Sequence, residues 1–249
     1  MSQQVSKAID LDKDENDDRP KYYAAIADNA TRIMMGQQGF VRADSVSKAN
    51  CILFTGGADI LPLLYGEEKL PSTYVDFTRD MQDIGTLRAI TKLDSRILLG
   101  ICRGAQFLNV MVGNGSLWQD VNNHNKGPHQ AIDTETGNII QVSSTHHQMM
   151  IPGSSGKIIL KAHEATRLRC VDWDWDLNPN EDANPECVLY DNVNALCYQP
   201  HPEFDGADNR ACRDYFFRKI EELFLTNKQI KAMLNHRDKI RKHTTKKVN

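Results

Sequence analysis

Short runs of mainly apolar residues alternate along the chain with longer segments in which apolar residues recur at helical spacing. Two of the short runs, at 51–55 and 96–101, are compact enough to form strands buried on both faces. Between them, residues 80–93 have the spacing of an amphipathic helix. This order predicts a βαβ unit, in which the two strands run parallel in one sheet.

The same pattern predicts further elements on both sides of this unit. Residues 22–39, 104–112 and 210–224 have helical spacing, and a first strand is placed at 5–11. Four later apolar runs predict shorter strands, at 139–143, 157–162, 187–190 and 195–198. Because strands alternate with helices, we expect one α/β domain over 1–249, with a mainly parallel central sheet and helices on both faces.

Charged and polar residues are concentrated at the two ends and in one internal segment. The acidic stretch at about 10–18 and the basic C-terminal tail at about 228–249 are both expected to be solvated. Residues 172–185, rich in Trp, Asp, Asn and Pro, are predicted to form a surface excursion. The formal net charge of −3 gives no reason to expect a nucleic acid or membrane partner. With no apolar run of about 20 residues and no apolar leader, we expect a soluble, cytoplasmic protein.

One of the six cysteines has unusual surroundings, since Cys102 lies between a predicted strand and a predicted helix and is flanked by Gly100 and Gly104. A side chain on so sharp a turn needs small neighbours, and it is held at the carboxyl edge of the sheet. The N-terminus of the following helix favours a thiolate at this position. The alternative is one more small buried hydrophobe, which is our expectation for the other five cysteines. The polar Arg103 that follows favours an exposed turn, so Cys102 is the predicted nucleophile.

A base for this thiol is predicted just after the strand at 195–198, in the segment Gln-Pro-His-Pro-Glu. The prolines favour an extended chain, in which residues two apart project to the same side. Glu203 can therefore orient the imidazole of His201, which completes a Cys-His-Glu relay with Cys102. The alternative is a surface turn with an ordinary salt bridge, and His146-His147 supplies a rival base.

The oxyanion of a tetrahedral intermediate needs hydrogen-bond donors that are already in place. The backbone N–H of Arg103 lies at the start of the predicted helix, and that of Gly57 lies in the turn after the strand at 51–55. These two groups are the candidate oxyanion hole.

A metal site is the competing interpretation of the remaining histidines. His124, His129, His146 and His147, with Asp120, carry suitable ligand atoms. Their spacing is irregular, and adjacent histidines usually point in different directions. We therefore expect no metal.

Several motifs occur in the order known from one family. They lie at 54–60, 62, 65–66, 79–80, 100–106, 109–110, 119–120, 146–148 and 199–203. On these motifs the chain resembles the class I glutamine amidotransferase-like proteins, and most closely their γ-glutamyl hydrolase branch, peptidase C26, which includes hydrolases of γ-glutamyl-γ-aminobutyrate. Ser143-Ser144 stand where that branch usually has Asn-Ser.

The resemblance implies a flavodoxin-like fold, a γ-glutamyl thioester at Cys102 and no cofactor. It places Gln106 against the glutamyl part of a small-molecule substrate, with Ser144, His146 and His147 approaching from the other side. It implies either a stand-alone γ-glutamyl amidohydrolase or a glutaminase component that delivers ammonia to a partner synthase. A non-enzymatic binding protein that grips an acidic partner with its basic tail is the third alternative, and a homodimer stays open.

Overall fold

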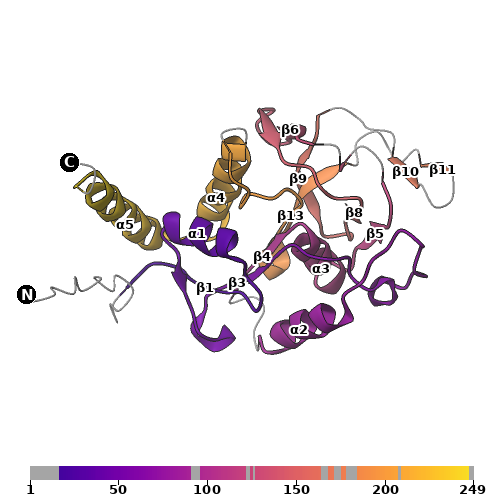
Figure 1. Ribbon diagram of the computed structural model, residues 1–249, viewed down its shortest axis with the longest axis horizontal. Coiled ribbons are helices and arrows are strands. Elements are labelled where there is room, and N and C mark those ends of the chain that lie inside the picture. The colour runs from indigo at the N-terminus through magenta and orange to yellow at the C-terminus, as the bar shows by residue number, and fades with distance from the viewer. Residues whose placement is uncertain are drawn as a thin grey trace, which may run out of the picture.

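Nine strands form one central sheet in the order β2-β1-β3-β4-β13-β12-β9-β6-β7. Several of them, including β3, β4, β13 and β9, are labelled in Figure 1. The computed structural model describes residues 17–90, 96–121, 124–125, 127–163, 168–170, 175–177, 184–206 and 209–246. The strands of the sheet are β1 (Lys21–Tyr23), β2 (Val41–Arg42), β3 (Cys51–Phe54), β4 (Ile97–Ile101), β6 (His129–Asp133), β7 (Ile139–Val142), β9 (Lys157–Ala162), β12 (Pro185–Tyr190) and β13 (Ala195–Tyr198). Two further pairs, β5 (Ser116–Trp118) with β8 (Met149–Ile151) and β10 (Leu168–Cys170) with β11 (Trp175–Leu177), are antiparallel.

The sheet has a parallel half and an antiparallel half. Strands β2, β1, β3, β4 and β13 all run parallel to their neighbours. From β12 onward, through β9 and β6 to β7, each pairing is antiparallel. The predicted βαβ unit is β3, α2 (Phe77–Arg88) and β4, and it lies at the centre of the parallel half.

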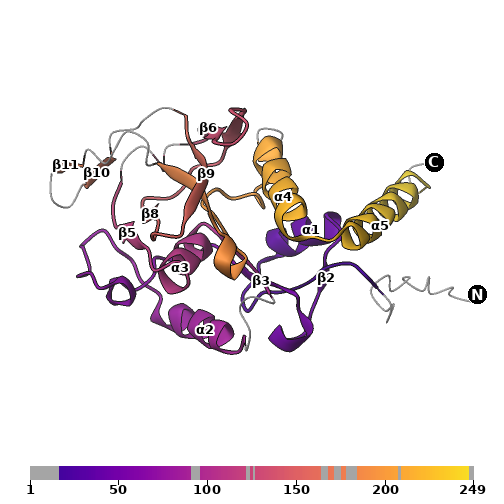
Figure 2. The same cartoon turned by 180° about the vertical axis from the view of Figure 1, so that it is seen from behind.

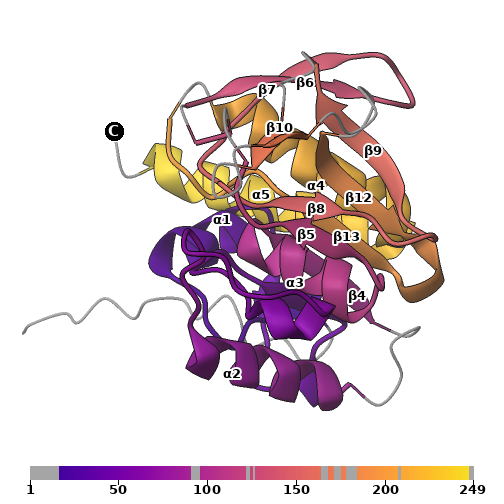
Figure 3. The same ribbon diagram turned by 90° about the vertical axis from the view of Figure 1, so that its right-hand side faces the viewer.

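Helices cover both faces of the sheet. On one face lie α1 (Asn29–Gln37), α4 (Arg210–Phe224) and α5 (Asn227–Lys246), which are grouped in Figure 2. The other face is covered by α2 and α3 (Arg103–Met111), as Figure 3 shows. Short 3₁₀ turns occur at Val46–Lys48, Pro62–Tyr65 and Asp191–Val193.

Alternate residues of β3 face the two helical layers. Cys51 and Leu53 pack in the core beneath α1 and α4, whereas Ile52 and Phe54 pack in the core beneath α2 and α3. All four are at most 2% exposed. Both faces of the strand are thus apolar, which explains the uninterrupted apolar run in the sequence.

Most of the predicted elements are present, and the fold class is confirmed. The helix expected at 22–39 is partly wrong, because its first residues form β1 and only Asn29–Gln37 are helical. The expected solvated tail at 228–249 is wrong over most of its length, because α5 extends to Lys246. Met233 of α5 is fully buried, and Arg237 donates to the carbonyl of Gln38 at 2.9 Å and pairs with Glu221 at 2.7 Å.

Some expectations fall on parts of the chain that lie outside the described residues. These are the strand at 5–11, nearly all of the acidic stretch at 10–18, and most of the surface excursion at 172–185. Within that excursion, Trp175–Leu177 form β11. No helix in the described ranges is long and apolar enough to cross a bilayer.

Two glycines allow α3 to pack directly on the backbone of the sheet. A Cβ at Gly104 would lie 2.0 Å from the carbonyl oxygen of Phe54 in β3. A Cβ at Gly100 of β4 would lie 2.5 Å from the carbonyl oxygen of Gly104. Because the obstructing atoms are backbone, neither position can accept a side chain unless the helix moves.

We therefore expect Gly104→Ala to lower the free energy of unfolding by at least about 2 kcal/mol, because overpacking against a rigid backbone is costly. The matched control is Gly85→Ala in α2, where nothing lies within 4 Å of an added Cβ. That change should be neutral or stabilise by up to about 1 kcal/mol, as expected for glycine to alanine in a helix. Urea denaturation of both variants measures the difference, and equal stabilities would contradict the packing described here.

Candidate active site

Three loops meet where neighbouring parallel strands end. Gly56 and Gly57 follow β3, Cys102 follows β4, and His201 comes shortly after β13. Since β3, β4 and β13 are adjacent and parallel, their carboxyl ends lie together at one edge of the sheet. This edge is where open α/β sheets hold their ligands.

Cys102 occupies a strained turn between β4 and α3. Its φ of 50° and ψ of −111° lie outside the regions that L-residues favour. Its N–H donates to the carbonyl of Tyr198 at 2.9 Å, and 9% of its surface is exposed. The predicted turn is therefore present, with Cys102 at the N-terminus of α3, but the expected exposure is wrong, because Cys102 is buried and packs in the core beneath α1 and α4.

The imidazole of His201 lies between a carboxylate and the thiol. Its Nδ1 is 2.7 Å from Oε1 of Glu203, and the ring and the Cys102 side chain both lie against Gly56. The ring of Phe204 stacks on it, with centroids 4.4 Å apart and planes 6° from parallel. Burial disfavours the imidazolium, but the contacts with Cys102 and Glu203 outweigh this and raise the pKa of His201 to about 10.

The backbone of His201 is fixed by a serine that sequence reasoning did not select. His201 N–H donates to Oγ of Ser143 at 2.7 Å, and this hydroxyl is 3.4 Å from the His201 carbonyl. Asn209 Nδ2 donates to the same carbonyl at 2.8 Å. The only sequence signal for Ser143 is that it departs from the Asn usual in the branch that the chain resembles.

The glycine turn after β3 lies against both Cys102 and His201. A Cβ added to Gly56 would be 3.0 Å from Cε1 of His201 and 3.8 Å from Cβ of Cys102. Gly57 has a φ of 156°. The guanidinium of Arg79 in α2 holds the turn, since it donates to the carbonyls of Thr55 at 3.2 Å and Gly56 at 3.4 Å.

Arg103, expected to favour an exposed turn, is instead 2% exposed. Its guanidinium forms ion pairs with Asp80 and Asp83 of α2, and Asp83 also pairs with Arg79 at 3.0 Å. The side chain is thus part of a buried charge network that joins the nucleophile turn to α2. Its backbone N–H lies at the first position of α3, where the N–H groups of a helix have no acceptor within the helix.

Of the four side chains predicted to contact substrate, three are buried and bonded within the protein. Gln106 donates to the carbonyl of Gln148 at 3.2 Å, Ser144 donates to the carbonyl of His124, and Nδ1 of His146 lies 2.8 Å from the Gln148 carbonyl.

The fourth, His147, has a side chain that is 29% exposed. Its Nε2 lies 3.0 Å from Asp59, in the segment after the glycine turn, and its Nδ1 lies 3.5 Å from Asp120. The hydrogen bond with Asp59 raises the pKa of His147 despite partial burial.

The histidines weighed together as metal ligands are divided between two places. His147 and Asp120 lie together near the glycine turn, whereas His124, His129 and His146 surround the carboxylate of Glu186. Sequence reasoning missed Glu186, because a single glutamate at the start of an apolar strand carries no local signal.

Comparisons with known proteins show which family the chain matches. The family model of peptidase C26 matches residues 19–169. The glutamine amidotransferase-like protein YvdE of Lactococcus lactis subsp. lactis (strain IL1403) is 36% identical over 195 residues, which cover 70% of this chain and 72% of that protein.

Two solved structures resemble the fold over nearly its whole length. A GMP synthase subunit from Thermoplasma acidophilum has a TM-score of 0.54 at 14% identity and covers 90% of this chain and 98% of its own. A glutamine amidotransferase from Thermotoga maritima has a TM-score of 0.52 at 13% identity, covering 88% of this chain and 96% of its own.

The raised pKa of His201 makes stability depend on pH. Because the folded value of about 10 lies above the ordinary 6.5, protonation of His201 stabilises the fold fully below about pH 6.5, and this contribution is lost as pH rises to about 10. We expect Glu203→Gln to lower the pKa of His201 and to move this loss to lower pH. NMR titration of the His201 ring and urea denaturation from pH 6 to 10 measure the two effects. Glu222→Gln, at an exposed glutamate of α4, is the control, and an unchanged pKa of His201 in Glu203→Gln would contradict the prediction.

Proposed function

Because the chain belongs to the peptidase C26 family, we propose that it hydrolyses the γ-glutamyl amide bond of glutamine or of a γ-glutamyl amine through a thioester at Cys102. The observation that carries the proposal is the position of His201 beside both Cys102 and Glu203, at the carboxyl edge of the parallel strands. This arrangement serves a nucleophile that must be deprotonated before it attacks a carbonyl.

In the first half of the reaction, the Cys102 thiolate attacks the γ-carbonyl carbon, and the carbonyl π electrons move to the oxygen. The tetrahedral intermediate then collapses, which breaks the C–N bond and leaves a γ-glutamyl thioester. The departing amine takes its proton from the His201 imidazolium, which the contacts with Cys102 and Glu203 favour.

In the second half, a water molecule attacks the thioester carbonyl and gives its proton to the now neutral His201. Collapse of this second intermediate breaks the C–S bond, releases glutamate and restores the thiolate. Glu203 stays ionised throughout, since its role is to orient the ring and stabilise the imidazolium.

The oxyanion of both intermediates is assigned to the backbone N–H groups of Gly57 and Arg103. The turn at Gly56 lies against Cys102 and His201, and Arg103 opens α3 beside the sulfur. Arg79 and the buried pairs of Arg103 with α2 hold the two backbones in place before the reaction begins. Such preorganised donors commonly supply a large share of the rate acceleration.

The solvent exposure of the four predicted side chains indicates which of them can touch a substrate. His147 is partly exposed and carries a raised pKa, so it is suited to a substrate carboxylate. Gln106, Ser144 and His146 would act by shaping the backbone around the site. A pocket of about 220 Å³ is lined in part by Ser143, Phe204 and Asn209, which contact His201, but Cys102 and His201 are not among its lining residues, so we assign it no part in substrate binding.

A second candidate function is a glutaminase component that delivers ammonia to a partner synthase. The name of the Lactococcus relative, a glutamine amidotransferase-like protein, favours it. Both functions use the same thioester chemistry. They differ in whether turnover needs a partner.

We expect a glutamine-mimicking diazoketone to alkylate Cys102 and no other cysteine of the chain. Labelling should be lost in Cys102→Ala and fall at least about a thousandfold in rate in His201→Ala, because removing a member of such a triad costs roughly this much or more. Peptide mass spectrometry locates the adduct. Cys51→Ala, at a fully buried cysteine of β3, is the control and should label at the normal rate. An adduct elsewhere would exclude Cys102 as the nucleophile.

The purified chain alone should release amine from γ-glutamyl-γ-aminobutyrate, γ-glutamylputrescine or glutamine, and Cys102→Ala should release none. Quantifying free glutamate and amine measures this directly. Diazoketone labelling at Cys102 together with no turnover of any of the three substrates would reject the stand-alone hydrolase and favour the partner-dependent glutaminase.

A further inference from the structure

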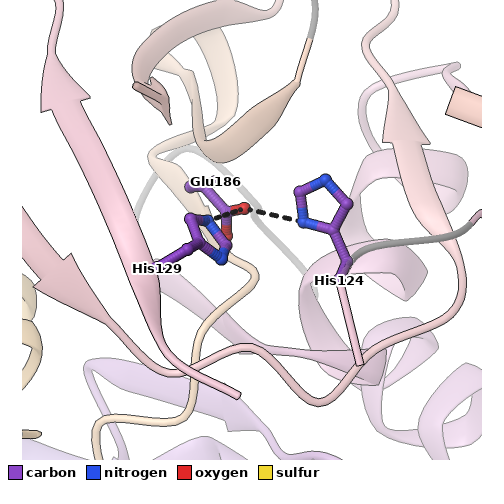
Figure 4. Close-up of side chains that lie close together, drawn as sticks. All are labelled: His124, His129 and Glu186. Carbon is purple, nitrogen blue, oxygen red and sulfur yellow. Dashed lines mark ion pairs between the residues drawn. The ribbon is translucent and has the colours of Figure 1, made fainter. Parts of the chain in front are cut away.

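Three histidines converge on one buried glutamate at the start of β12. Glu186 is 0% exposed, and its Oε1 lies 2.9 Å from Nε2 of His129, 3.3 Å from Nδ1 of His124 and 3.9 Å from Nε2 of His146. Figure 4 shows His124 and His129 on two sides of the carboxylate. His129 opens β6, and His124 and His146 lie in loops, so the cluster joins segments far apart in the sequence.

His146 faces the carboxylate with Nε2, while its other ring nitrogen is already bonded. Its Nδ1 lies 2.8 Å from the carbonyl of Gln148, and a carbonyl only accepts, so Nδ1 carries a ring proton. Nε2 lies 3.9 Å from Oε1 of Glu186, is buried and has no hydrogen-bond partner among the described residues. In the neutral ring with a proton on Nδ1, this nitrogen carries a lone pair that can face a cation.

The carboxylate of Glu186 makes no well-aligned hydrogen bond in the described ranges. Neither of its oxygens has a hydrogen-bond partner of good geometry there, although Nε2 of His129 lies 2.9 Å from Oε1 as an ion pair. A buried carboxylate without aligned donors is costly, and such groups are usually paired or bind a metal.

We propose that His124, His129 and Glu186 bind a Zn²⁺ ion, with Nε2 of His146 beside the fourth coordination position. The three ligand atoms lie within 4.8 Å of one another. Ligands on a tetrahedron with Zn–N and Zn–O distances of about 2.0–2.1 Å are roughly 3.3 Å apart, close to the separations from Glu186 Oε1. Two imidazoles and one carboxylate are a ligand set that suits zinc. An ion between them would explain why Nε2 of His129 lies close to the carboxylate of Glu186 without an aligned hydrogen bond.

Hydrogen bonds join the residues beside the proposed site. The Gln148 carbonyl fixes the tautomer of His146, so that Nε2 faces Glu186. The backbone carbonyl of His124 accepts from His146 N–H at 3.0 Å and from the hydroxyl of Ser144, which fixes the two loops relative to each other. The ion would therefore clamp the loop at His124 and segment 143–148 onto β12.

This clamp is a positioning device for the candidate active site. Segment 143–148 carries Ser143, which holds the backbone of His201, and His147, which contacts Asp59 beside the glycine turn. The proposed ion touches neither the thiol nor His201, so its contribution would come through the placement of this segment.

The test measures zinc binding directly, without activity. All proteins carry Cys102→Ala, so that the thiolate cannot bind zinc. After metal removal, titration with Zn²⁺ against a chromophoric chelator should give one site per chain. Glu186→Gln and His129→Ala should weaken binding at least about 100-fold, because each removes a ligand. His163→Ala, at an exposed histidine outside the cluster, should bind as tightly as the parent.

Two further measurements keep the result decisive if Glu186→Gln folds poorly. Co²⁺ in the parent should give the strong visible absorption of a four-coordinate site, and this absorption should disappear in His129→Ala, whose side chain is 23% exposed at the start of β6. Zn²⁺ should also raise the Tm of the parent but not that of His129→Ala. A parent that takes up no zinc, or affinity unchanged in His129→Ala, would overturn the proposal and leave the cluster as a network of buried charges.

Discussion

The close approach of α3 to the backbone of β3 and β4 is the constraint on which the rest of the site depends. Gly104 touches the Phe54 carbonyl so closely that no side chain fits, and Gly100 meets the first turn of α3 in the same way. The chain can turn from β4 into a helix this near the sheet only if the residue between them adopts an unfavourable conformation. That residue is Cys102, with its φ of 50°. The strain that lifts the thiol to the sheet edge is thus compensated by helix packing, and the same packing aims the N-terminus of α3 at the sulfur.

The buried charges extend this constraint to the neighbouring loop. Arg103 leaves the nucleophile turn toward α2, where Asp80 and Asp83 pair with it, and Asp83 also pairs with Arg79. Arg79 in turn binds the carbonyls of Thr55 and Gly56. Removing one partner of such a network would leave a buried charge uncompensated, which is far more costly than losing a surface pair. The glycine turn and the nucleophile turn are therefore held together by one set of ion pairs, so that displacement of one turn disturbs the other.

The sequence predicted most features that are local. The βαβ unit around β3 and β4 and the turn at Cys102 depend on residues within a few positions of one another. The extended conformation expected for His201-Pro202-Glu203 is wrong, because Pro202 and Glu203 form a turn in which Phe204 N–H donates to the His201 carbonyl at 3.3 Å. Glu203 still reaches the His201 ring from this turn. Strands β1 and β2 were missed because two or three residues are too few to show a period of two.

Helix α5 was taken for a solvated tail because its composition is basic. The buried Met233 that anchors it packs against Gly39, which is far away in the sequence. The burial of Arg103 and the contacts of Glu186 could not be predicted either, since their partners lie at least 20 residues away, in α2 and in the loops around His124 and His146.

The adjacent histidines show how the two halves of the sheet act on one site. His146 turns toward Glu186, which belongs to the antiparallel half, whereas His147 turns toward Asp59, which follows a strand of the parallel half. Segment 143–148 therefore spans the boundary, and Ser143 at its start holds the backbone of His201. Because β12 pairs with β13, which leads to His201, any shift of Glu186 relative to this segment would change the distance between Ser143 and the base. Cys102 and His201 follow strands of the parallel half, and Ser143, which follows β7 of the antiparallel half, holds the backbone of His201 in place.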